Sequence, residues 1–113
     1  LYADPRRISE ADYRLNYKNG MLVKYGKELS DSDTTGEYIG IAKLKSSILS
    51  KFNILHNQLI DDEKYGMWWE DVLYQMSDRG TLIYVQEVKN YFWSEIDYIE
   101  DYNRTIEYIE KDK

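Results

Sequence analysis

The dipeptide Asn19-Gly20 constrains the fold of this chain more than any other pair of residues. Asn-Gly between two short alternating runs is the strongest local signal for a β-hairpin, because both residues tolerate the positive φ angles of a tight turn. The run before it, residues 13–17, alternates as a half-buried strand does, and residues 21–25 supply the return strand. The sequence therefore predicts an antiparallel hairpin near the start of the chain.

A buried strand and two helices are expected after the hairpin. In residues 38–44, apolar side chains occupy both odd and even positions, which favours a strand covered on both faces. A three-four spacing then predicts a helix, capped by Ser46 or Ser47, that ends near residues 61–64. Its apolar face comprises Ile48, Phe52, Leu55 and Leu59. A second helix is expected over residues 67–79, with Gly80 at its C-terminal end. Its apolar face comprises Trp69, Val72, Leu73 and Met76.

The last third of the chain predicts a strand pair and a third helix. Residues 82–85 and 92–96 suit strands, and the helix begins near Asp97. Its apolar stripe comprises Ile99, Tyr102, Ile106 and Ile109. Strands that alternate with helices predict an α/β layered sandwich with a mixed sheet, in which residues 1–113 form a single unit. Ligands of such sheets bind beyond the carboxyl ends of strands, which is where Asp97 is expected to lie.

Composition excludes several kinds of site. The chain has no Cys and a single His, His56, so thiolate and histidine-cluster metal sites are excluded. Any metal site must use oxygen ligands, which favours Mg²⁺, Mn²⁺ or Ca²⁺. A net charge of -6 disfavours nucleic acid and anionic membranes as partners. No apolar run is long enough to span a bilayer, and the lack of Cys suits a cytoplasmic protein.

Three segments carry a resemblance to a known family. They are residues 24–29 (Lys-Tyr-Gly-Lys-Glu-Leu), residues 34–44 (Thr-Thr-Gly-Glu-Tyr-Ile-Gly-Ile-Ala-Lys-Leu) and residues 93–97 (Trp-Ser-Glu-Ile-Asp). In this order they resemble nucleotidyltransferases of the sugar-nucleotide and phosphocholine cytidylyltransferase type. Residues 68–73 fall where such proteins carry an acidic helix start. The resemblance covers nearly the whole chain and implies the acceptor-side, C-terminal part of a Rossmann-like nucleotidyltransferase domain.

The resemblance also implies an activity. Such an enzyme transfers a nucleotidyl group from a nucleoside triphosphate, here CTP, to a phosphorylated small molecule, with Mg²⁺ bound and pyrophosphate released. Phosphocholine, an aminophosphonate or a sugar phosphate is the expected acceptor. The family's Gly-rich nucleotide loop has no counterpart among the six scattered glycines. That loop is expected in a missing N-terminal half, without which this chain is expected to be inactive.

Four residues are the candidate site. The resemblance implies that Asp97 is the second of two aspartates that hold Mg²⁺, although Asp97 and the next three residues also match a helix capping box. Glu37 is either an acceptor contact or an ordinary loop carboxylate. Trp68 is either a helix-packing residue or part of a pocket that binds a quaternary ammonium group by cation–π attraction. Asp71, with its neighbour Glu70, would add negative charge beside such a cation.

Two other interpretations stay open. The chain can be a non-catalytic half-domain that acts as a binding or assembly module, whose open sheet edge pairs with a partner or with a second copy in a homo-oligomer. Alternatively, the resemblance is coincidental and the chain is an acidic, aromatic-rich α/β domain of another role.

Overall fold

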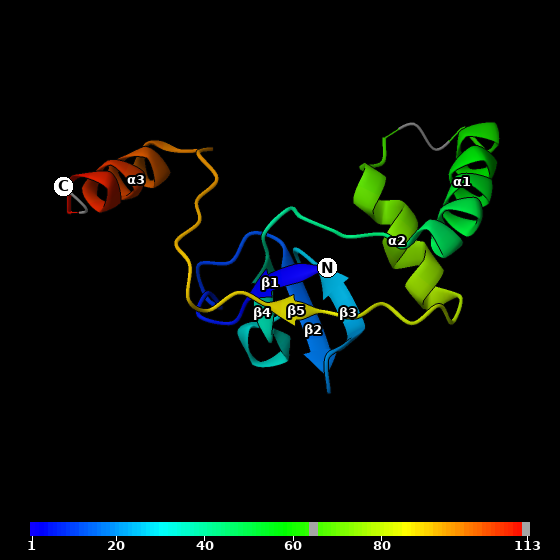
Figure 1. Ribbon diagram of the computed structural model, residues 1–113, viewed down its shortest axis with the longest axis horizontal. Coiled ribbons are helices and arrows are strands. Elements are labelled where there is room, and N and C mark those ends of the chain that lie inside the picture. The colour runs from blue at the N-terminus through cyan, green and yellow to red at the C-terminus, as the bar shows by residue number, and fades with distance from the viewer. Residues whose placement is uncertain (64–65, 112–113) are drawn as a thin grey trace.

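The fold is a mixed α/β arrangement of a five-stranded sheet and three α-helices within residues 1–63 and 66–111, which the computed structural model describes (Figure 1). The strands are β1 (Tyr2–Asp4), β2 (Arg14–Lys18), β3 (Met21–Gly26), β4 (Gly36–Tyr38) and β5 (Gln86–Glu87). They lie in the order β3-β2-β4-β1-β5. Strand β1 is parallel to β5 and antiparallel to β4, so the expected mixed sheet is confirmed.

The predicted hairpin is confirmed as β2 and β3. Lys18 pairs with Met21 across the turn, and Asn19 and Gly20 have φ angles of 53° and 74°. Both angles lie in the left-handed region that Asn and Gly tolerate best. The side chains of Leu15 and Leu22 are buried beneath this hairpin. The turn chemistry alone was therefore sufficient to locate these two strands.

Helices α1 (Ser46–Asp61) and α2 (Trp69–Asp78) lie together beside the sheet (Figure 1). Both were predicted, and Gly80 closes α2 with a φ of 96°. Their shared core comprises Leu55, Leu59, Val72, Leu73, Tyr74 and Met76. Two details were wrong, because Lys45 and not a serine stands at the start of α1, and Trp69 is exposed.

The strand expected over residues 38–44 is largely wrong. Strand β4 ends at Tyr38, and the exposed Gly40 adopts a φ of 85° that no regular strand accommodates. Tyr2 still pairs with both sides of this break, since it accepts a hydrogen bond from Ile39 N and donates one to Ile41 O. Residues 39–41 therefore run beside β1, but Gly40 interrupts the extended backbone. The side chain of Ile41 is exposed.

The predicted strands at residues 82–85 and 92–96 are wrong too. Only Tyr84 forms an isolated bridge, to Met21, and the strand that pairs with β1 is β5. Residues 92–97 run as irregular chain, so Asp97 does not follow a strand. A short apolar run does not show which strand it can pair with. In the folded chain β5 occupies the edge of the sheet beside β1.

Helix α3 (Ile99–Lys111) begins where expected but buries none of its residues. It lies on the opposite side of the sheet from α1 and α2 (Figure 1). Its apolar stripe is open, with Ile99 65% and Ile109 49% exposed. The helix is held to the segment before it by Phe92, whose ring stacks on that of Tyr108 at 4.0 Å. No helix in residues 1–63 and 66–111 is long and apolar enough to cross a membrane.

Candidate functional site

A cavity of about 530 Å³ brings the four predicted site residues together. Glu37 comes from β4, Trp68 and Asp71 from the start of α2, and Asp97 from the irregular segment before α3. Eight carboxylates line the cavity against three cationic side chains, and six aromatic residues line it as well. A hollow with this lining attracts cations and repels free anions.

Stacked tyrosines support the cavity and hold α2 against the sheet. The ring of Tyr74 in α2 lies between the rings of Tyr13 and Tyr25, with centroid distances of 5.3 and 4.4 Å. The ring of Tyr38 in β4 meets Tyr13 edge-on at 6.3 Å. Both arrangements are favourable aromatic geometries. This column rigidly joins β3, α2 and β4 beneath the cavity.

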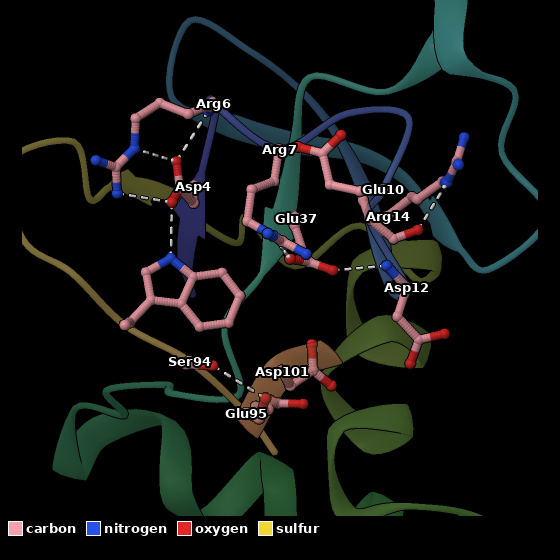
Figure 2. A network of polar contacts seen from close by, with 12 residues as sticks. Asp4, Arg6, Arg7, Glu10, Asp12, Arg14, Glu37, Ser94, Glu95 and Asp101 are labelled. Atoms are coloured by element: carbon pink, nitrogen blue, oxygen red, sulfur yellow. Dashed lines mark hydrogen bonds and ion pairs between the residues drawn. The ribbon is translucent and has the colours of Figure 1, made fainter. Parts of the chain in front are cut away.

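Glu37 is buried and already bonded on both of its carboxylate oxygens (Figure 2). Arg7 Nε donates to Oε1 at 2.5 Å, and the backbone N of Asp12 donates to Oε2 at 2.6 Å. These bonds hold Arg7 and the loop of Asp12 at the rim of the cavity. Glu37 can therefore act by placing Arg7, which lines the cavity and whose side chain is mostly buried.

Asp4 fastens the irregular segment before α3 to the sheet. Its carboxylate accepts hydrogen bonds from the side chain of Arg6 and, at 2.7 Å, from Trp93 Nε1 (Figure 2). Burial alone would raise the pKa of Asp4, but the hydrogen bonds from Arg6 and Trp93 outweigh it and hold the pKa below its usual value. Arg7 in turn lies 5.6 Å from the centre of the Trp93 ring in a cation–π contact. Trp93 is thus fixed on its edge and on its face.

Glu95 is the carboxylate whose ionisation the cavity disfavours most clearly. Burial raises its pKa, and the negative charges of Asp97, Glu37 and neighbouring aspartates raise it further. Glu95 Oε1 would lie 3.1 Å from a Cβ at Gly40, so the glycine leaves room for this side chain. Figure 2 shows Glu95 beside Asp101 at the start of α3. A bound cation would relieve this crowding of negative charge.

Helices α2 and α3 both begin at the cavity and are capped in the same manner. The carboxylate of Asp71 accepts a hydrogen bond from Trp68 N at 2.8 Å. The carboxylate of Asp101 accepts hydrogen bonds from the backbone N of Asp97 and of Tyr98. The capping box that the sequence suggested for Asp97 is therefore wrong, because the capping carboxylate belongs to Asp101 and leaves that of Asp97 free of this role.

The described residues do not form a complete metal site. No group of three or more Asp, Glu or His side chains within residues 1–63 and 66–111 could hold a metal ion. Asp97 is exposed and offers one carboxylate beside Glu95. One carboxylate suits Mg²⁺ only where substrate phosphates supply further oxygens, so the residues described here cannot hold the ion alone.

Sequence reasoning missed several residues of the cavity. Tyr38, Trp93 and Glu95 stand inside the segments that carried the resemblance, and that position was the available signal. Arg7 was visible only as one of an adjacent pair, and nothing marked Tyr74 as more than a helix residue. Comparison with known proteins adds nothing to this assignment, since no protein family, no curated protein and no solved structure matches the chain.

Proposed function

We propose that this chain forms the acceptor-binding part of a CTP-dependent nucleotidyltransferase. The observation that carries the proposal is that Glu37, Trp68, Asp71 and Asp97, chosen from separate stretches of the sequence, line one cavity. Four residues chosen at random from a chain of this length would seldom line the same cavity. The acceptor-side role thus has a physical site in which it can take place.

The lining favours an acceptor that carries both a positive and a negative group. The excess of carboxylates suits the amine end of a phosphorylated amine such as phosphocholine or an aminophosphonate. Arg7, Lys27 and Arg104 line the same cavity and can face the phosphate end. A sugar phosphate has no positive group to offset the eight carboxylates, so it fits this cavity less well.

In the proposed reaction an oxygen of the acceptor's phosphate attacks the α-phosphorus of CTP, and pyrophosphate leaves. The residues of this chain hold the acceptor in line and keep its amine end among the carboxylates. Mg²⁺ would neutralise charge on the nucleotide phosphates when bound, and Asp97 would contribute one oxygen ligand.

The test is pyrophosphate release by the natural gene product that contains this chain, with CTP, Mg²⁺ and phosphocholine or phosphoethanolamine. Asp97→Asn should lower the rate by roughly 100-fold, because it removes a charged oxygen that stabilises the reacting phosphates. Acceptor binding, measured by calorimetry, should change little. Asp61→Asn, at the end of α1 and outside the cavity, is the matched control. Full activity of Asp97→Asn would overturn the role of Asp97, and no pyrophosphate release from the unaltered protein would overturn the proposed reaction.

A second candidate function, an assembly module, is supported by the exposed stripe of α3. A second cavity, of about 560 Å³, is lined mostly by apolar residues together with Lys43 and Lys45, and by no acidic residue of the described ranges 1–63 and 66–111. Helix α3 combines its apolar stripe with Glu100, Asp101, Glu107 and Glu110. This complementarity suits insertion of α3 from a second copy of the chain. A molar mass of 13.6 kDa by light scattering at high concentration would exclude such assembly.

A further inference from the structure

Three arginines near the start of the chain use their guanidinium groups differently. Arg6 donates from two nitrogens to the carboxylate of Asp4, and Arg14 donates from all three of its nitrogens. Arg7 donates only from Nε, to Glu37, and its Nη1 and Nη2 have no acceptor in the described part of the chain. Arg6 and Arg14 therefore serve the fold, whereas Arg7 keeps donors in reserve.

The unused nitrogens of Arg7 can be reached from the acidic cavity. Arg7 lines that cavity, and its side chain is 21% exposed. Among the described residues, the fully enclosed side-chain atoms without a partner are the hydroxyls of Tyr38 and Tyr74 and Nε of Arg104. Nη1 and Nη2 of Arg7 are not among them, so both keep accessible surface. A guanidinium has five N–H bonds, and those on these two nitrogens remain for a ligand.

The guanidinium of Arg7 is also held in one orientation (Figure 2). The buried carboxylate of Glu37 fixes its Nε, and the backbone N of Asp12 fixes that carboxylate in turn. The ring of Trp93 lies 5.6 Å away, and Asp4 holds this ring through Nε1. An arginine that is already ordered loses less conformational entropy when it binds a ligand.

The other two cations of the cavity are less suited to hold an anionic group. Lys27 is 64% exposed, and its nearest carboxylate, that of Asp12, lies 3.8 Å away. Arg104 has an enclosed Nε, and its Nη2 donates to the hydroxyl of Ser94. Arg7 is therefore the cation that is both ordered and left with two donors.

We propose that Arg7 is a specificity-determining residue of the cavity, whose Nη1 and Nη2 bind two oxygens of the acceptor's phosphate or phosphonate while Glu37 and Trp93 position it. The two nitrogens of a planar guanidinium match two oxygens of such a group. The excess of carboxylates attracts any amine, so it does not distinguish a phosphorylated amine from a bare one. This inference rests on the proposed function and names the residue that makes this distinction.

The test is calorimetric titration of the natural gene product that contains this chain with phosphoethanolamine and, separately, with ethanolamine. The two probes share the amine and differ in the phosphate. The unaltered protein should bind phosphoethanolamine roughly 10- to 100-fold more tightly, as hydrogen bonds between charged groups imply. Arg7→Gln should lower the affinity for phosphoethanolamine by about tenfold or more, and it should not weaken the binding of ethanolamine.

A double variant separates this contact from a general change in charge or stability. Arg7→Gln together with Glu37→Gln removes one positive and one negative charge, so the net charge of the cavity stays the same. No buried carboxylate is left unpaired, which favours folding, and a melting curve checks it. The double variant should also lose the preference for phosphoethanolamine. Arg79→Gln, which alters an exposed arginine outside the cavity, is the matched control and should change neither affinity.

The outcomes distinguish this inference from the proposed function. If the unaltered protein does not bind phosphoethanolamine, the proposed function fails and the inference fails with it. If a folded double variant keeps the preference, or if the unaltered protein binds both probes equally, the inference alone is overturned. Arg7→Lys provides a further check, because it keeps a positive charge beside Glu37 but lacks the paired donors. It should fold and still bind phosphoethanolamine about tenfold more weakly, and an unchanged affinity would contradict the two-oxygen contact.

Discussion

Helices α2 and α3 start with nearly the same local pattern and end in opposite environments. Trp68-Trp69-Glu70-Asp71 opens one and Tyr98-Ile99-Glu100-Asp101 opens the other. In both, the final aspartate of the pattern accepts a hydrogen bond from the backbone N of the aromatic residue three positions earlier. Yet α2 buries Val72, Leu73, Tyr74 and Met76, whereas α3 buries nothing.

The difference teaches that amphipathic periodicity and capping make a helix without deciding what covers it. Helix α2 follows α1 closely in the chain, so the two can pack as a pair and then close on β3. Helix α3 follows an irregular segment that Asp4 fastens to the far side of the sheet through Trp93. That tether sets the position of α3 away from the apolar surfaces of α1 and α2.

The largest effect on the free energy of unfolding is expected when a core residue of α2 is truncated, and truncation in the exposed apolar stripe of α3 should cost far less. Leu73→Ala should lower the free energy of unfolding by about 2–5 kcal/mol, because it leaves a cavity beside buried neighbours. Ile109→Ala should cost less than about 0.5 kcal/mol, because its side chain is already half exposed. Urea unfolding of both variants measures the difference. A large cost for Ile109→Ala would mean that α3 is covered in solution, and light scattering would then show whether a second copy covers it.

A smaller effect is expected from cutting the tether that places α3. Asp4→Asn should lower the free energy of unfolding by about 2 kcal/mol, because it weakens charge-assisted hydrogen bonds from Arg6 and Trp93. The indole N–H resonance of Trp93 should shift towards that of an unbonded indole. Asp61→Asn should alter neither quantity. An unshifted resonance in Asp4→Asn would contradict the tether.

The same tether predicts a dependence of stability on pH. The pKa of Asp4 is lower in the folded protein than its ordinary value of 3.8, so its carboxylate favours the folded state when ionised. That contribution is present above the unfolded pKa and is lost as the pH falls through the folded pKa. Unfolding measured between neutral pH and about pH 3 should therefore show a steeper loss for the unaltered protein than for Asp4→Asn.

The smallest effect is expected from removing the two capping aspartates. Asp71→Ala should lower the global free energy of unfolding by about 1 kcal/mol, because α2 unfolds with the core. Asp101→Ala should reduce helical circular dichroism while the global transition stays unchanged, because α3 can fray independently. Equal losses of global stability in both variants would show that α3 is as closely coupled to the core as α2.

Strong local signals were enough for part of the fold. Asn19-Gly20 placed the hairpin, and the spacing of apolar residues placed α1 and α2 to within a few residues. Strands β1 and β5 could not be predicted, because segments of three and two residues carry no usable periodicity. They exist as strands only through the pairing of β1 with both β4 and β5. The apolar run at residues 92–96 resembled a strand, but the edge it needed was already occupied by β5.

The candidate site divides in the same manner. Glu37, Trp68, Asp71 and Asp97 were selected from residue type and family resemblance, and all four line one cavity. The stacking of Tyr74 against Tyr13 and Tyr25 could not be foreseen, because stacking depends on which rings the fold brings within reach.

The sequence by itself determined the elements whose hydrogen bonds close locally: a hairpin and three helices. It also determined which functional groups are present: more carboxylates than cationic side chains, many tyrosines and no cysteine. The tertiary structure decided which apolar stripe was buried and which was left open, because burial needs a second surface that no local pattern specifies. It also decided that carboxylates and aromatic rings distant in the chain line one cavity, because β4, α2 and the segment before α3 come together only in the folded chain.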